Sequence, residues 1–184
     1  VFSSFALGRA SVPPPPPPID HTKPHRLLVG PVNYAGQGWQ WARALERLPS
    51  ASAVNFVTAE NNPYHYPVDA SVRWRTFEYS RAWQRDMLTS VGVDYTHVLI
   101  EACFPVLGGM DGGDVLRQAD RMRQRGASIA IVGHGTDIRL PSRHAQLEPG
   151  SFLGDHEWTH VERLEQQVSK NLQLINDLKA PTFV

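Results

Sequence analysis

A histidine, an aspartate and an arginine fall within one expected turn, at His134, Asp137 and Arg139, directly after an apolar segment. Gly135 would let this turn bend sharply. The imidazole of His134 could act as a general base or donate a hydrogen bond to a sugar hydroxyl or a phosphate, because histidine gains and loses a proton near neutral pH. We therefore take His134 as the candidate catalytic residue and Asp137 and Arg139 as candidate substrate-binding residues. The alternative is a locally packed histidine beside a surface ion pair.

A second candidate is the glycine turn Asn33–Gly38, which lies where the first expected strand passes into the first expected helix. Glycine lets the backbone approach a ligand closely, and the N-terminus of a helix attracts anions such as phosphate. Gly36, Gln37 and Gly38 are therefore candidate substrate-binding residues. The dinucleotide fingerprint G-x-G-x-x-G is incomplete, because Trp41 stands where a small residue is needed, so a classical dinucleotide site is disfavoured. A tight turn without a ligand is the alternative.

The glycine-rich segment Gly108–Asp114 could bind a divalent ion through Asp111 and Asp114, but two carboxylates fall far short of a calcium-loop pattern. A flexible turn that ends in a helix N-cap at Asp114 is the favoured interpretation. The histidines of the chain show no zinc-ligand spacing. We therefore predict neither a metal nor a cofactor.

Short apolar strands alternate with longer helical segments from residue 26 onward, which is the pattern of a parallel sheet with helices on both faces. We expect an α/β, Rossmann-like, three-layer fold whose carboxyl edge carries both the glycine turn and His134. The expected strands cover 26–32, 53–58, 71–77, 96–102 and 128–132, with a further one beginning at 181. The expected helices cover 37–48, 80–91, 114–124 and 156–178.

The first 24 residues differ from the rest of the chain, because they contain an unbroken run of prolines at 13–18. Such a run favours extended polyproline II, so residues 1–24 are predicted to be a disordered linker and residues 25–184 a single domain. The chain starts at Val1 rather than Met, shows no secretory signal and stops early in an expected strand. We therefore expect it to be the N-terminal half of a longer protein.

Charge and hydropathy argue against two classes of partner. Lysine plus arginine number 18 and aspartate plus glutamate number 18, so no overall positive field would hold a nucleic acid. No apolar run approaches the ~20 residues needed to cross a bilayer. The single cysteine, Cys103, cannot form an internal disulfide and fits a reducing, cytoplasmic location.

The segment Ser128-Ile-Ala-Ile-Val-Gly-His-Gly-Thr-Asp137 follows the glycine turn and the alternating strands, and it precedes a long helix and a strand that begins at Pro181. This arrangement resembles the N-terminal half of a GT-B glycosyltransferase, above all the large retaining group whose members build glycolipids, polysaccharides and sucrose. The resemblance implies that this half binds a sugar, lipid or small-molecule acceptor and shares a nucleotide-sugar donor with a missing C-terminal domain. It places Gly36 and Gly38 opposite the donor phosphates and His134 near the transferred sugar.

On this resemblance the chain alone is expected to be inactive, since the half that stabilises the leaving nucleotide diphosphate lies outside it. Two other functions stay open. One is a GT-B-like or flavodoxin-like module that binds or scaffolds without catalysis, and the other is a different α/β enzyme such as a nucleotide-dependent oxidoreductase. A peripheral contact with a membrane is also left open.

Overall fold

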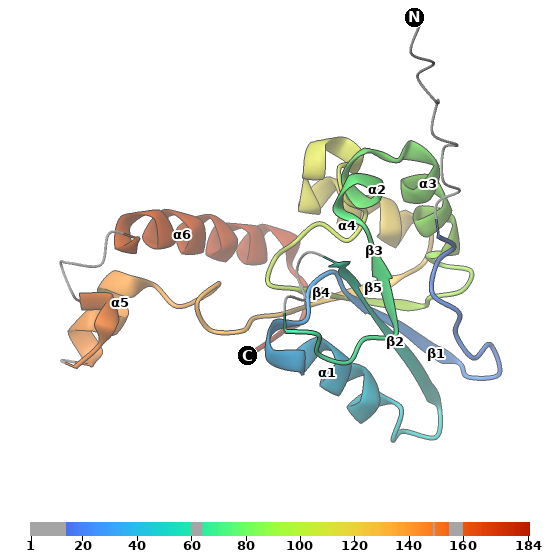
Figure 1. The fold of residues 1–184 in the computed structure, drawn as a ribbon, viewed down its shortest axis with the longest axis horizontal. Helices are drawn as coiled ribbons and strands as arrows, with labels where there is room; N and C mark the ends of the chain where they lie inside the picture. The colour runs from blue at the N-terminus through green and yellow to red at the C-terminus, as the bar shows by residue number, and fades with distance from the viewer. Residues whose placement is uncertain (1–13, 60–63, 149, 155–159) are drawn as a thin grey trace, which may run out of the picture.

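Parallel strands form the central sheet, and their spatial order within the described residues is β3-β2-β1-β4-β5-β6 (Figure 1). The computed structural model describes residues 14–59, 64–148, 150–154 and 160–184. This all-parallel sheet with helices around it confirms the expected α/β, Rossmann-like fold. The strands are β1 (His25–Gly30), β2 (Ala51–Thr58), β3 (Ala70–Val72), β4 (His97–Glu101), β5 (Ser128–Val132) and β6 (Thr182–Phe183).

The central strands pair in parallel because they are apolar on both faces and are buried on both. Every residue of β2 is buried, and so are the last residues of β1 and β4. The registers align Val29 of β1 with Asn55 of β2 on one side and with Leu99 of β4 on the other. The carboxyl ends of β1, β4 and β5 therefore meet at one edge of the sheet, where the chain leaves it.

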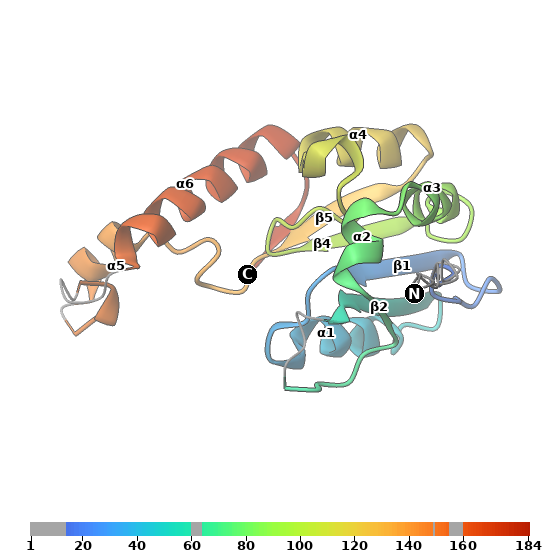
Figure 2. The same cartoon turned by 45° about the horizontal axis from the view of Figure 1, so that its top comes forward.

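Helices cover the two faces of the sheet unequally (Figure 2). On one face lies α1 (Gln37–Leu45), which shares a small core with Val29, Leu99 and Val132. The other face carries the larger core and is covered by α2 (Trp74–Tyr79), α3 (Arg81–Ser90), α4 (Val115–Gln124) and the end of α6 (Val161–Leu178). The remaining helix, α5 (Pro141–Leu147), packs against α6 and projects away from the sheet (Figure 1). No helix of the described segments is long and apolar enough to span a bilayer.

Some expected elements have different bounds in the structure. The expected strand 71–77 was wrong beyond Val72, because Trp74–Tyr79 forms α2 instead and thereby buries Phe77 against Trp83, with ring centroids 5.5 Å apart. The expected helix 37–48 ends at Leu45, and the last helix begins at Val161, while residues 156–159 lie outside the described residues. The expected strand at 181 is confirmed as β6, which pairs with β5.

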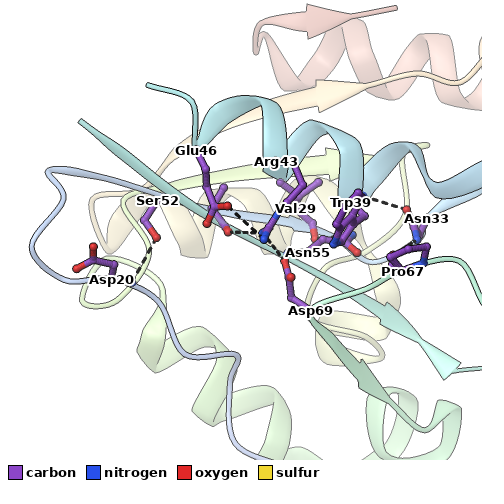
Figure 3. Close-up of polar contacts among 11 residues, drawn as sticks. Asp20, Val29, Asn33, Trp39, Arg43, Glu46, Ser52, Asn55, Pro67 and Asp69 are labelled. Carbon is purple, nitrogen blue, oxygen red and sulfur yellow. Dashed lines mark hydrogen bonds and ion pairs between the residues drawn. The ribbon is translucent and has the colours of Figure 1, made fainter. Parts of the chain in front are cut away.

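Residues 14–24 correct the expectation of a free linker. Pro17 is buried, and its carbonyl accepts a hydrogen bond from the hydroxyl of Tyr95. Ile19 packs against the larger core, and the backbone N–H of Asp20 donates to Ser52 Oγ at 3.3 Å (Figure 3). A polyproline segment has no internal hydrogen bonds, so its free carbonyls can be recruited by a buried donor such as this phenol. The rest of the expected linker, residues 1–13, lies outside the described residues.

Candidate functional site

The candidate site lies where the strand order reverses, between β1 and β4. The chain leaves β1 toward α1 on one face and leaves β4 toward α4 on the other, so the two connections separate at the sheet edge. In open α/β sheets this switch point is where ligands bind. Three segments meet there: the glycine turn Asn33–Gly38 after β1, the residues 102–104 after β4, and the turn that starts at His134 after β5.

The structure brings His134 and the glycine turn together at this edge. His134 Nδ1 forms a short hydrogen bond with Gln37 Oε1, and the ring of Tyr34 stands edge-on to the imidazole with centroids 5.7 Å apart. His134 Nε2 lies 3.3 Å from Glu101 Oε1, and the histidine side chain is only 6% exposed. Since Gln37 Oε1 can only accept, Nδ1 carries the hydrogen of that bond. The expectation that both segments share one edge of the sheet is confirmed.

Glu101 is the central residue that the sequence analysis did not select. It ends β4 and its side chain is fully buried. Burial raises the pKa of its carboxyl group, while the nearby imidazole of His134 and the backbone N–H of Val32 oppose that rise. An acidic residue inside an apolar strand was the available signal, because a buried carboxylate needs a partner to remain in the core.

Position 38 requires glycine because the side chain of Glu101 occupies the space that a Cβ atom would fill. A Cβ atom built on Gly38 would lie 2.6 Å from both carboxylate oxygens of Glu101 and 2.8 Å from Asn55 Nδ2. The carboxylate therefore sits against the first turn of α1, where the positive end of the helix dipole favours a negative charge. An internal carboxylate thus lies at the helix end where many Rossmann folds bind a ligand phosphate.

Asn33 holds the glycine turn in place. Its Oδ1 accepts a hydrogen bond from the backbone N–H of Trp39 at 3.0 Å, and its Nδ2 donates to the carbonyl of Pro67 at 2.9 Å (Figure 3). The first bond satisfies a free N–H in the first turn of α1. Gly36 adopts a left-handed conformation with φ of 77°, and both Gly36 and Gly38 are buried. The exposed part of the turn is Tyr34, Ala35 and Gln37, which an approaching phosphate or sugar would meet first.

Asp137 and Arg139 have different environments. Asp137 Oδ1 accepts a hydrogen bond from the backbone N–H of His134 at 2.7 Å, and its carbonyl accepts one from Asn171 Nδ2 at 2.7 Å, so this residue fixes the turn that carries the imidazole. Arg139 is exposed, and its guanidinium makes no ion pair within the described part of the chain. Asp137 therefore has a positioning role in addition to the substrate-binding role predicted for it.

A cavity of about 560 Å³ opens beside His134, between the loops that follow β4 and β5 and the helix α6. Ala102 and Cys103, at the end of β4, both have positive φ values of 50° and 59°, which turn the backbone sharply out of the sheet. Burial, with the charge of Asp137 adding to it, raises the pKa of Cys103 to about 12, so this thiol is no nucleophile. The side chains that line the cavity include Tyr34, Phe104, His134, Asp137 and Arg163.

Buried polar atoms that have no hydrogen-bond partner among the described residues concentrate at this edge. They include Asn55 Oδ1, both carboxylate oxygens of Glu101, His134 Nε2 and Asp137 Oδ2. The contact between His134 and Glu101 has the separation of an ion pair without the angles of a hydrogen bond. Leaving a buried polar group unpaired costs about 1–3 kcal/mol, so such a cluster is typical of a place that binds a ligand.

The glycine-rich segment Gly108–Asp114 is structural. A Cβ atom on Gly108 would lie 1.9 Å from the carbonyl oxygen of Phe77, so the close approach of α2 requires glycine there. The expected N-cap is confirmed, because the Asp114 side chain accepts a hydrogen bond from the N–H of Arg117 at 3.1 Å. Asp111 pairs with Arg121 at 2.6 Å. Within the residues described here, no group of three histidine, cysteine or acidic side chains is placed to hold a metal.

Comparisons with protein-family models, with curated proteins and with solved structures found no match to this chain. The geometry of the site and the sequence features above are therefore the basis for assigning a function.

Proposed function

We propose that this chain is the acceptor-side domain of a glycosyltransferase that moves a sugar from a nucleotide-sugar donor to an acceptor. One observation carries the proposal: His134 lies at the switch point of the sheet, between Gln37 of the glycine turn and the buried Glu101, beside an open cavity. The segment 128–137 that resembles such enzymes is the segment that delivers this histidine. The opposing lobe that holds the donor nucleotide in that class would face the same edge.

The cavity beside His134 suits a sugar in size and chemistry. Its volume lies within the range of small-molecule pockets, which is roughly 300–1,000 Å³. The rings of Tyr34 and Phe104 offer apolar surface to the C–H face of a sugar ring, and Asp137 Oδ2 is a buried acceptor without a donor. A sugar hydroxyl donating to this oxygen would satisfy it. Arg163 supplies a cation at the rim for an acidic sugar or a phosphate.

In this proposal the amide of Gln37 occupies, in the free protein, the position beside His134 Nδ1 that a ligand hydroxyl would take. Its side chain is exposed and can rotate into solvent, whereas Glu101 is fully buried and cannot move away from Nε2. A hydroxyl that displaces the Gln37 amide would meet the Nδ1 hydrogen of His134. Glu101 is then a positioning residue, because it holds the imidazole through the opposite nitrogen and does not itself reach the ligand.

Ligand-observed saturation-transfer NMR tests the proposal with the chain as it stands. Nucleotide-sugars and simple methyl glycosides are offered to the wild type, to His134→Ala and to His21→Ala, a control whose side chain is 60% exposed and lies outside the site. We expect sugar protons to be saturated by the wild type and the control, and the affinity to fall roughly five- to thirtyfold in His134→Ala, since a hydrogen bond to a polar ligand contributes about 1–2 kcal/mol. Absence of sugar binding, or equal binding by both variants, contradicts the proposal.

A non-catalytic binding module is the second candidate, and one observation favours it. Both ring nitrogens of His134 already face protein groups, and the side chain is only 6% exposed, as in a structural histidine. Gln37→Ala separates the two functions. If Gln37 stands in for a ligand, its removal frees Nδ1 and raises sugar affinity. If His134 is structural, Gln37→Ala lowers thermal stability and changes no ligand affinity.

A further inference from the structure

A second and larger cavity, of about 1120 Å³, lies on the other side of His134, along α1 and the ends of β5 and β6. The helices that follow β4 and β5 pack on the opposite face of the sheet. Of the described helices, α1 is the one on this face, and the space beside it is the cavity. Its floor is apolar and includes Val132 and Ile138. The ring of Trp41 forms one wall and packs against Phe183 with centroids 5.9 Å apart.

Among the described residues, the charged side chains that line this cavity belong to arginines: Arg43, Arg47 and Arg139. No described aspartate or glutamate is among its lining residues, although the whole chain has a formal net charge of +0. Such a one-signed lining raises the local potential and favours an anion.

Two of the three arginines form no ion pair with a described residue and can bind an anion. Arg43 is already paired with Asp69 at 2.8 Å and Glu46 at 3.2 Å, and it lies over the ring of Trp39 at 5.5 Å (Figure 3). Arg47 and Arg139 make no ion pair with any described residue.

Arg139 lies at the end of the cavity nearest to His134. Its Nη2 would be 3.8 Å from a Cβ atom built on Gly135, so the guanidinium folds back over the turn that carries the histidine. Arg47 follows the C-terminal end of α1. At a rise of 1.5 Å per residue, it lies about 15 Å along the helix axis from Gln37. The apolar floor and the indole rings lie along the length between them.

We propose that this cavity binds an organic phosphate, with the phosphate against Arg139 and an apolar or aromatic body against Trp41 and the floor at Val132. Arginine is the side chain suited to phosphate, and an indole face stacks on a base or covers an alkyl chain. The body can be a nucleoside or a lipid chain, since both combine a phosphate head with an apolar extension. The site goes beyond the proposed sugar pocket, because it lies on the opposite side of His134, and its other lining residues are not shared with that pocket.

Calorimetric titration with three probes tests this site. Uridine diphosphate represents a nucleotide, decyl phosphate below its micelle concentration represents a lipid phosphate, and inorganic pyrophosphate represents the head alone. We expect one of the two organic phosphates to bind at least tenfold more tightly than pyrophosphate, and the tighter of them identifies the body. Arg139→Gln should weaken that binding roughly tenfold or more, because it removes a charge-assisted hydrogen bond. Arg125→Gln, at the far end of α4, is the matched control and should bind as the wild type does.

The indole N–H resonances provide a readout at the cavity itself. Binding should shift the resonance of Trp39, which Trp39→Phe assigns without removing the Trp41 ring that packs on Phe183. The site is refuted if no probe binds at millimolar concentration, if all three bind equally, or if Arg139→Gln and Arg125→Gln behave alike. Sugar binding in the other cavity depends on His134 and not on Arg139, so failure of one proposal leaves the other measurable.

Discussion

Gly38→Ala should disturb the contact between Glu101 and His134. The new Cβ atom would lie 2.6 Å from both carboxylate oxygens of Glu101 and 2.8 Å from Asn55 Nδ2. Both neighbours are fully buried, so neither can swing into solvent to make room. The carboxylate must shift within a packed interior, and its 3.3 Å contact with His134 Nε2 must change with it.

The expected loss of stability follows from two opposing effects. Forcing an additional carbon into a packed core costs about 1–3 kcal/mol. Replacing glycine by alanine inside a helix returns up to about 1 kcal/mol, and Gly38 has no positive φ that would forbid alanine. The net expectation is a free energy of unfolding lower by about 1–2 kcal/mol, which corresponds to a fall in Tm of roughly 2–8 °C for a domain of this size.

Urea titrations of a double-mutant cycle measure this prediction. Glu101→Ala removes the carboxylate that the new methyl group meets, so Gly38→Ala should cost at least about 1 kcal/mol less in that background. Gly150→Ala is the matched control, because a Cβ atom there has no neighbour within 4 Å, and it should leave stability nearly unchanged. An equal cost of Gly38→Ala in both backgrounds would refute the argument that Glu101 is what keeps position 38 small.

Further outcomes follow from buried groups. Burial raises the pKa of Glu101, so the folded state holds this proton more tightly than the unfolded chain. The contribution of this group to stability is fully present below the ordinary glutamate range and is lost as pH rises through the raised pKa, and Glu101→Gln should remove that loss in urea titrations. The pKa of about 12 for Cys103 predicts that iodoacetamide reacts near neutral pH roughly a thousandfold more slowly in the folded chain than in urea, as mass spectrometry would show. Tyr95→Phe removes the hydrogen bond to Pro17, which should cost about 1 kcal/mol and speed amide hydrogen exchange at Ile19 and Asp20; unchanged exchange would contradict the docking of that segment.

The fold was predictable because strand burial leaves a clear pattern. Apolar segments such as Ser128–Val132 carry the signal of a strand buried on both faces, and their alternation with helices specifies a parallel sheet. The expected strand 71–77 failed because a β-branched and aromatic run has high strand propensity, whereas tertiary packing of Phe77 against Trp83 favours a helix. The docking of Pro17 also depends on a distant partner, Tyr95, which local sequence cannot indicate.

The site was predictable only in part. The positions of His134 and the glycine turn followed from the rule that parallel strands end at one edge. Glu101 was missed because it stands within a strand, and its role depends on which strands become neighbours of β1. The burial of Gly38 against Glu101 depends on the same long-range contact, since a glycine in a turn gives no indication of what approaches it.

Mapping of amide chemical shifts on the isotope-labelled chain during titration with a methyl glycoside tests the central claim most directly. The account predicts that the largest shifts fall at residues 34–38, 101–104 and 134–137, around the switch point. Shifts confined to the opposite edge of the sheet, near His25 and His97, whose rings meet edge to face there with centroids 5.5 Å apart, would contradict it.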